Sequence, residues 1–201
     1  MSSESIAEYR IILASNSSIR KKILEDSGIS FEVIASDVDE EELKKSFSSK
    51  NFKDNCLALA KAKALEVSNK QKNAYVIGSD QICCYGEEIF SKPLTKENCF
   101  KTLSKLSGNT HYQNCGISIC KDGKEIWSHY AQAALTMKSL TDSEIKDYID
   151  KYEPLMACGA YRFESLGKNL FSSTKGDETT IQGLTLNPII NFLSSEKVID
   201  I

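Results

Sequence analysis

Residues 74–84, with the sequence AYVIGSDQICC, decide the fold that we expect for this chain. An apolar run of this kind is typical of a strand that is buried on both faces of a sheet. The polar trio at 79–81 interrupts it, and open α/β sheets carry their binding sites at strand ends. A buried carboxylate there requires a metal, a cation or a proton. Asp80 is therefore a candidate functional residue with Lys63 and Lys92 as candidate counter-charges, although it could instead cap a neighbouring element.

Around this strand, the first half of the chain is typical of parallel strands and the second half of a hairpin. Residues 121–124 (KDGK) have the Asp-Gly centre of a type I′ turn. The expected strands are 8–14, 31–36, 74–84, 111–120 and 125–137. The first two expected helices run from 19 to near Gly28 and over 55–68. The other three follow polar caps: Thr95 for a helix to 105, the capping box at Thr141 for a helix to 151, and Asn187 for a final helix with Pro188 as its first residue. The pattern predicts a mixed α/β fold.

Composition narrows the class of protein. With 201 residues and 41% hydrophobic content, the chain can fill one core, so we expect a single domain over 1–201. A net charge of -3 gives no broad positive field for nucleic acid, which we therefore exclude as a partner. No apolar run approaches the roughly 18–20 residues of a membrane span, and the first ten residues lack an export signal. We expect a cytoplasmic protein that does not enter a membrane.

The seven cysteines are odd in number and fall mostly in apolar runs, which indicates reduced, buried thiols. With no CxxC pair and only His111 and His129 as nitrogen ligands, a structural zinc site is not expected. Cys115 and His111 would share one face of a strand, as a nucleophile pair requires. We favour the alternative that both are packed strand residues.

Two further segments suggest ligand chemistry. The turn at 15–20 (SNSSIR) combines hydroxyls, free backbone N–H groups at a helix N-terminus and the Arg20 guanidinium, which together favour a phosphate. The same residue types are also common helix caps. The acidic cluster at 37–42 is typical of a solvated surface, but one member could complete a Mg²⁺ site with Asp80 and substrate oxygens.

The segment at 159–167 (GAYRFESLG) joins two glycines, two aromatic residues and a carboxylate. Such a loop can stack on a nucleobase and read its edge. The alternative is a glycine-bounded turn whose aromatic side chains belong to the core.

Seven blocks in this order resemble the signatures of the Maf family of nucleotide pyrophosphatases and span nearly the whole chain. The matching blocks are 13–20 (LASNSSIR, resembling LASxSPxR), 38–40 (VDE), 59–64 (LAKAKA, resembling LAxxKA), 77–81 (IGSDQ), 92–94 (KPL, resembling GKPL), 106–111 (LSGNTH, resembling LSGxxH) and 183–186 (GLTL, resembling GLPL).

The resemblance implies an elongated mixed β-sheet with flanking helices and two lobes around a central nucleotide cleft, an ITPase-like fold often found as a homodimer. It also implies hydrolysis of a nucleoside triphosphate to the monophosphate and pyrophosphate with Mg²⁺ or Mn²⁺. Such an activity would remove non-standard nucleotides.

By the same resemblance, each candidate residue receives a role. Asp80 would be the central catalytic carboxylate, as general base or metal ligand, with Glu40 as its acidic partner at the metal. Lys63 and Lys92 would neutralise the phosphates. The residues implied to bind the substrate are Ser15, Ser17, Arg20, Gln81 and Glu164.

The expected base specificity rests on one segment and one further residue. The segment 79–83 (SDQIC) and Glu164 are similar to the branch of the family that prefers 7-methyl-GTP, and a carboxylate suits the donors of a guanine edge. Ile19 stands where that branch has tryptophan. The alternatives are a dTTP/UTP pyrophosphatase, a catalytically weak nucleotide-binding regulator of cell division, and a phosphohydrolase acting on sugar phosphates.

Overall fold

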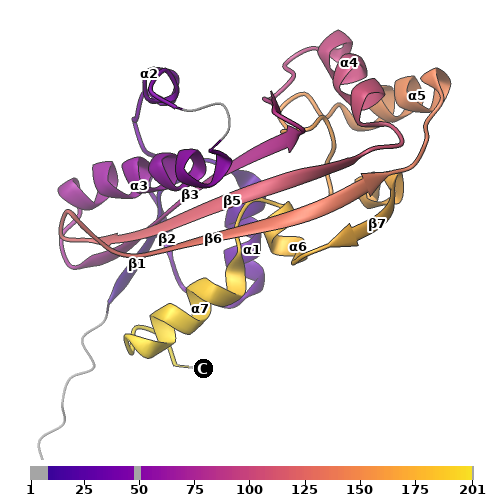
Figure 1. Ribbon diagram of the computed structural model, residues 1–201. Coiled ribbons are helices and arrows are strands. Elements are labelled where there is room, and N and C mark those ends of the chain that lie inside the picture. Colours follow the sequence, from indigo (N-terminus) through magenta and orange to yellow (C-terminus); the bar gives the residue numbers. More distant parts are fainter. Residues whose placement is uncertain (1–8, 48–50, 201) are drawn as a thin grey trace, which may run out of the picture.

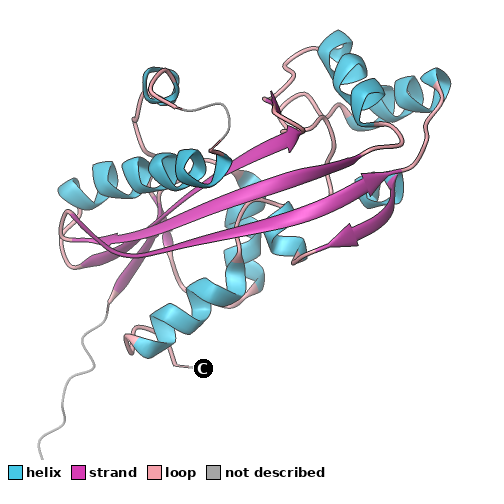
Figure 2. Cartoon of the chain, viewed as in Figure 1, coloured by secondary structure: helices cyan, strands magenta, loops and turns pink. Residues whose placement is uncertain are grey.

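In the computed structural model, which describes residues 9–47 and 51–200, the chain forms a mixed sheet with strand order β2-β1-β3-β5-β6-β7, and β4 pairs with β3 (Figure 1). The sheet is elongated and has helices along both faces and at one end (Figure 2). The strands are β1 (Arg10–Leu13), β2 (Glu32–Val33), β3 (Ala74–Tyr85), β4 (Glu88–Phe90), β5 (Thr110–Lys121), β6 (Lys124–Met137) and β7 (Phe171–Lys175). The expected α/β class and mixed sheet are confirmed.

Strand directions follow the two halves of the sequence. β1 pairs in parallel with both β2 and β3, whereas β3, β5, β6 and β7 are antiparallel neighbours. Asp122 and Gly123 have φ of 51° and 79° at the β5–β6 turn, as the expected type I′ hairpin requires. Of the strand predicted over 8–14, Glu8 lies outside the described residues.

The helices begin at polar caps. Ser17, Asn51, Thr95 and Thr141 each accept a backbone N–H at a helix start, and Thr141 and Glu144 complete the expected capping box. The α-helices are α1 (Ser18–Asp26), α2 (Glu40–Lys44), α3 (Phe52–Lys70), α4 (Lys96–Leu106), α5 (Asp142–Tyr152), α6 (Glu178–Ile181) and α7 (Leu186–Ser195); η1 (Leu166–Leu170) is a 3₁₀-helix.

The apolar residues gather on both faces of the sheet and at its far end. α3 packs on one face, and α1 and α7 pack on the other, where Leu24 and Leu193 are fully buried. A separate cluster joins α4, α5, β6 and β7 at the far end (Figure 1). Helices therefore flank an elongated sheet that has one apolar cluster on each face and a third at its far end.

Several short elements differ from the sequence prediction. α2, β4, η1, β7 and α6 were not predicted, because runs of three to five residues carry little periodicity. The strand expected over 31–36 is reduced to the two exposed residues of β2. Asn187 and Pro188 lie inside α7, whose N-cap is Thr185. Pro188 is tolerated there because N–H groups of the first helical turn have no intrahelical partner.

Within the described ranges, no helix is long and apolar enough to cross a membrane. The seven cysteines are free thiols, and six of them are buried, as the reduced state predicted from the sequence requires.

Gly78 sets the spacing between β3 and α3. A Cβ at this position would lie 2.1 Å from the Ala60 carbonyl oxygen, a rigid backbone atom, so a larger residue would force the helix away from the strand. We expect Gly78→Ala to lower the free energy of unfolding by about 3 kcal/mol, measured by urea denaturation.

Gly86→Ala is the matched control, because no atom lies within 4 Å of a Cβ there and only its φ of 59° opposes alanine. We expect it to cost about 1 kcal/mol. Equal losses for the two variants would contradict the close approach of α3 to β3.

Candidate active site

A cleft lies where one edge of β3 has no neighbouring strand. On this edge β1 pairs with residues 74–77 and β4 with 83–85, whereas β5 pairs with 76–84 on the other edge. Among the described strands, none covers the gap between β1 and β4, and a cleft of about 1190 Å³ opens there. Because side chains alternate along a strand, residues 80–82 reach this cleft from both faces of the sheet.

On the face covered by α3, Lys63 Nζ lies between two carboxylates. It donates to Asp80 Oδ1 at 2.8 Å and lies 2.9 Å from Glu40 Oε1. The side chains of Lys63 and Asp80 are only 10% and 11% exposed, while that of Glu40 is 40% exposed. Three residues selected from the sequence therefore form one ion-pair network at the cleft.

The local sequence explains how these three side chains meet. Gly78 lets α3 approach β3 closely, so Lys63 reaches the strand from the buried side of its helix. Glu40 is the first residue of α2, which Asp39 caps by accepting the Glu42 N–H at 3.0 Å. The acidic cluster expected on a solvated surface is thus a short helix that directs one of its members into the cleft.

Two further lysines act on Glu40. Burial raises the pKa of the Glu40 carboxyl, but the hydrogen bond and charge of Lys63, with the charges of Lys44 and Lys92, outweigh burial, so this pKa lies below its usual value. Lys44 and Lys92 line the same cleft. Lys92 was selected from the sequence and Lys44 was not, because its position depends on α2. Glu40 is therefore ionised at neutral pH.

On the opposite face, backbone carbonyls near α6 hold two polar side chains. Arg20 Nε donates to the Gly183 carbonyl at 2.8 Å, and Arg20 Nη1 donates to Ser15 Oγ at 3.3 Å. Gln81 Nε2 donates to the Ile181 carbonyl at 2.6 Å. The residues on this side that were predicted to bind substrate and that line the cleft are Ser15, Ser17, Arg20 and Gln81. The Gln81 side-chain amide and the Arg20 Nε–H are therefore already used within the fold.

The loop after α5 forms another wall of the cleft. Tyr161 and Phe163 are 4% and 5% exposed and pack on Phe171, so the alternative of core aromatic residues is correct for both rings, and the expectation that they stack on a base is wrong. Between and after them, Arg162 and Glu164 are exposed and line the cleft. Glu164, which was predicted to bind substrate, therefore lies at the cleft, and Arg162 is a neighbour that we did not select from the sequence.

Cys115 and His111 are packed strand residues, as we favoured. His111 Nε2 is hydrogen-bonded to Tyr161 Oη at 2.9 Å, and burial lowers the pKa of this imidazole to about 4. Burial raises the pKa of the Cys115 thiol, whose neighbour is Ser79 Oγ at 3.8 Å. A neutral thiol and a neutral imidazole with separate partners do not form a nucleophile pair.

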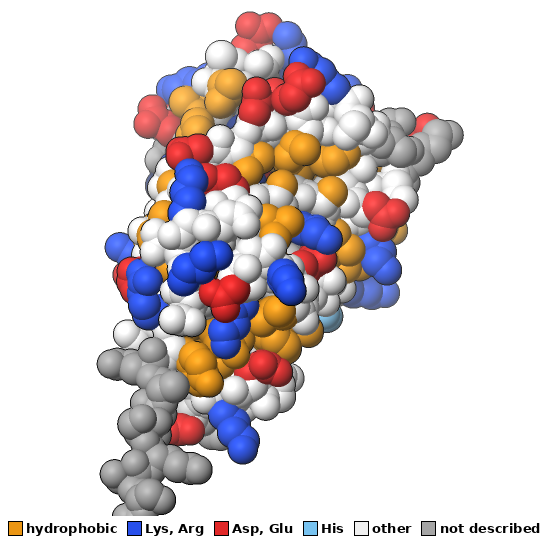
Figure 3. All heavy atoms as spheres, turned by 90° about the vertical axis from the view of Figure 1, so that its left-hand side faces the viewer, with side chains coloured by type: hydrophobic (Ala, Val, Ile, Leu, Met, Phe, Trp, Pro, Cys, Tyr) orange, Lys and Arg blue, Asp and Glu red, His pale blue; other side chains and the backbone are white. Residues whose placement is uncertain are grey.

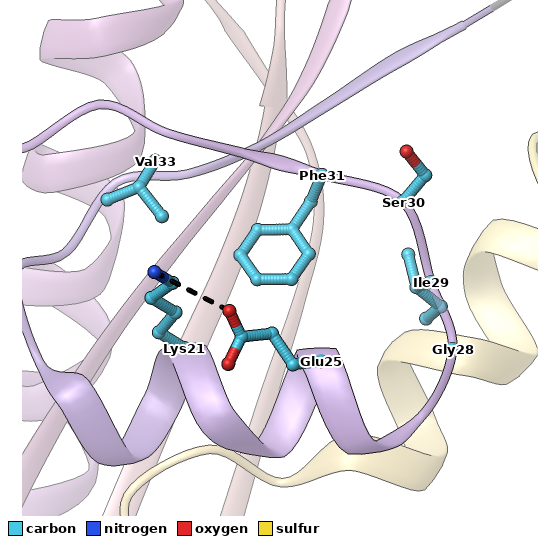
Figure 4. Close-up of a pocket in the computed structure, with 7 residues that line it drawn as sticks. All are labelled: Lys21, Glu25, Gly28, Ile29, Ser30, Phe31 and Val33. Atoms are coloured by element: carbon cyan, nitrogen blue, oxygen red, sulfur yellow. Dashed lines mark ion pairs between the residues drawn. The ribbon is translucent and has the colours of Figure 1, made fainter.

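A smaller pocket lies between α1 and β2 (Figure 4). Lys21 and Glu25, one turn apart on α1, point toward one another on the helix side of this pocket, 3.5 Å apart, beside the ring of Phe31. Both charged side chains are about half exposed, so their pairing contributes little. None of the residues selected from the sequence lines this pocket.

Charges of both signs cover one face of the molecule. On the face shown in Figure 3, lysine and arginine side chains are interspersed with aspartate and glutamate. That face has no continuous basic surface.

Comparison with known proteins places the chain in a family. The family model for Maf-like proteins matches residues 10–196. The chain is 39% identical over 199 residues to a nucleoside triphosphate pyrophosphatase of Legionella pneumophila (strain Corby), covering 99% of this chain and 100% of that protein. It is 38% identical over 195 residues to a 7-methyl-GTP pyrophosphatase of Brucella abortus biovar 1 (strain 9-941), covering 95% and 98%.

Among solved structures, the chain is similar to the Ham1 protein of Staphylococcus aureus, with a TM-score of 0.48, 18% identity, and coverage of 93% of this chain and 99% of that one. The match to the family model and the identity with full-length relatives agree with the seven sequence blocks. This chain belongs to the family of Maf-like proteins.

Proposed function

We propose that this protein is a nucleoside triphosphate pyrophosphatase that cleaves the bond between the α- and β-phosphates. The observation that carries the proposal is the position of Lys63 Nζ, within 2.9 Å of both the Asp80 and Glu40 carboxylates in the cleft. A buried carboxylate next to a cation can accept a proton, while the cation offsets charge that develops on phosphate. The names of the curated relatives support the same reaction.

The chain's own residues account for the steps of this reaction. A water oxygen bonds to the α-phosphorus, the bond to the bridging oxygen breaks, and pyrophosphate leaves with that oxygen. Asp80 accepts the proton released by the water. Lys63, Lys92 and Arg20 stabilise the charge that accumulates on the phosphate oxygens, and all three line the cleft. Lys44 is a fourth cation that lines the cleft and can stabilise the same charge.

The carboxylates also fit a divalent cation. In the described part of the chain, no three His, Cys, Asp or Glu side chains gather at one point, so the protein alone does not form a closed cage. Mg²⁺ and Mn²⁺ prefer oxygen ligands, and Mg²⁺ is usually held by one or two carboxylates with substrate phosphates and water. Asp80 and Glu40, each with one oxygen at Lys63, match that donor set. When bound, the cation supplies Lewis acidity and neutralises phosphate charge.

For the base, we propose 7-methyl-GTP. Glu164 lines the cleft and can accept hydrogen bonds from the N1–H and the exocyclic amine of guanine, and its negative charge suits the positive ring that N7-methylation creates. A relative at 38% identity is named for this substrate. Preference for UTP or dTTP would keep the chemistry and change the base, whereas binding without turnover would make the protein a nucleotide-binding regulator.

Asp80→Asn tests the role of the central carboxylate. The amide cannot accept the proton, so we expect kcat for pyrophosphate release to fall by roughly 10²–10⁴-fold, with an unchanged circular dichroism spectrum. Asp147→Asn, an exposed position on α5 outside the cleft, is the control and should keep full activity. Turnover of the Asp80 variant within a few-fold of the wild type would remove Asp80 from this role.

Removal of divalent cations tests the metal proposal. We expect EDTA to abolish pyrophosphate release, and an excess of Mg²⁺ or Mn²⁺ to restore it, because the cation neutralises the triphosphate in the cleft. Undiminished turnover in the chelator, after prior dialysis against it, would show that the lysines and Arg20 suffice.

Glu164→Gln tests the base assignment. We compare kcat/KM for 7-methyl-GTP, GTP, UTP, dTTP and CTP in the wild type and the variant. The amide keeps the shape but replaces one acceptor oxygen with a donor, so we expect about a 10-fold or larger loss for 7-methyl-GTP and little loss for UTP. Equal losses for both nucleotides would mean that Glu164 does not read the base.

A further inference from the structure

The backbone of Arg162 is held from several sides. Its N–H donates to Tyr148 Oη at 3.0 Å, and its carbonyl accepts from Ser165 Oγ at 3.0 Å. Gly167 packs so closely that a Cβ there would lie 2.1 Å from the Arg162 carbonyl oxygen. The Cα–Cβ direction of Arg162 is therefore fixed by the fold, although its side chain is exposed.

The residues around Arg162 alternate between the core and the cleft. Tyr161 is buried, and its hydroxyl is hydrogen-bonded to His111 Nε2 at 2.9 Å and to Gln113 Nε2 at 2.7 Å. Phe163 is buried against Phe171. These two anchors leave Arg162 and Glu164 as the exposed pair that lines the cleft.

Arg162 and Glu164 carry opposite charges but are not paired. No hydrogen bond or ion pair connects either side chain to another described residue, and none connects them to each other, although exposed charges elsewhere in the protein do pair. The Arg162 guanidinium is a hydrogen-bond donor, and the Glu164 carboxylate beside it is an acceptor. Together they suit a ligand edge on which an acceptor lies next to donors.

We propose that Arg162 is a second base-reading residue, which donates to the O6 carbonyl of a guanine ring while Glu164 accepts from its N1–H and exocyclic amine. This proposal rests on the proposed function and extends it from one residue to a pair. Guanine and 7-methylguanine both offer these three groups, because the methyl group is on N7; its positive charge strengthens the donation to Glu164.

Other ligand edges fit this pair less well. Adenine presents an amine at position 6, which opposes the guanidinium donors of Arg162. Uracil offers O4 and N3–H, but its O2 would face the second oxygen of the Glu164 carboxylate. A phosphate would suit Arg162 and be repelled by Glu164, and the cleft already supplies cations for phosphate on α1, α2, α3 and the β4–α4 segment, namely Arg20, Lys44, Lys63 and Lys92.

The test compares GTP with 6-thio-GTP in the wild type and in Arg162→Met. Sulfur at position 6 is a weak acceptor, while N1–H and the amine are retained. We expect Arg162→Met to lower kcat/KM for GTP by about 10- to 100-fold and for 6-thio-GTP by less than about threefold. Equal losses for the two nucleotides would overturn the proposal, because they would assign Arg162 to the phosphates or to the fold.

Binding of the corresponding monophosphates, GMP and 6-thio-GMP, measured by calorimetry, separates this proposal from the proposed function. If the wild type releases no pyrophosphate, the proposed function fails. The base-reading role of Arg162 is still supported in that case if Arg162→Met weakens the binding of GMP and not of 6-thio-GMP. Lys168→Met, an exposed charge outside the cleft, is the matched control and should change neither nucleotide. Arg162→Leu, which also lacks a donor, repeats the comparison if Arg162→Met does not fold.

Discussion

The ion-pair network of Lys63 with Asp80 and Glu40 is the interaction on which the site depends. The Lys63 ammonium and the Asp80 carboxylate are both nearly buried, and each is stable there only because the other is beside it. Either charge alone would bear the full cost of desolvation. Lys63 and Asp80 meet because Gly78 lets α3 pack closely against β3. Lys63 also forms an ion pair with Glu40, the first residue of α2, and so links α2 to the same site. One close helix–strand contact therefore assembles residues from three elements at the cleft.

The second constraint is the interrupted edge of β3. Between the end of β1 and the start of β4, consecutive residues of one strand face opposite sides of the sheet and both reach the cleft: Asp80 meets Lys63 under α3, and Gln81 binds the backbone of α6. The cleft consequently has Lys63 and the carboxylates on one face and Arg20 on the other, and the loop at 159–167 forms a further wall. In the proposed function the phosphates lie among the cations, and the base lies at this loop.

Sequence patterns predicted the parts of this structure that local chemistry determines. The capped helices, the Asp-Gly hairpin and β3 follow from periodicity and turn residues. The position of Asp80 in an apolar run selected it together with Lys63, and the resemblance of the seven blocks added Glu40. α2, α6 and β7 are too short to carry a period, so Lys44 was missed. The sequence does carry a signal for Arg162. Aromatic and charged residues alternate in Tyr-Arg-Phe-Glu at 161–164, and this pattern predicts that Arg162 and Glu164 lie on the same exposed side.

The most direct test of the central claim follows the oxygen of the attacking water. Hydrolysis in ¹⁸O-enriched water, with the products analysed by ³¹P NMR and mass spectrometry, shows which phosphorus is attacked. If Asp80 and Lys63 direct water to the α-phosphorus, one ¹⁸O atom appears in the nucleoside monophosphate and none in pyrophosphate. Label in pyrophosphate, or release of orthophosphate in its place, would contradict the account.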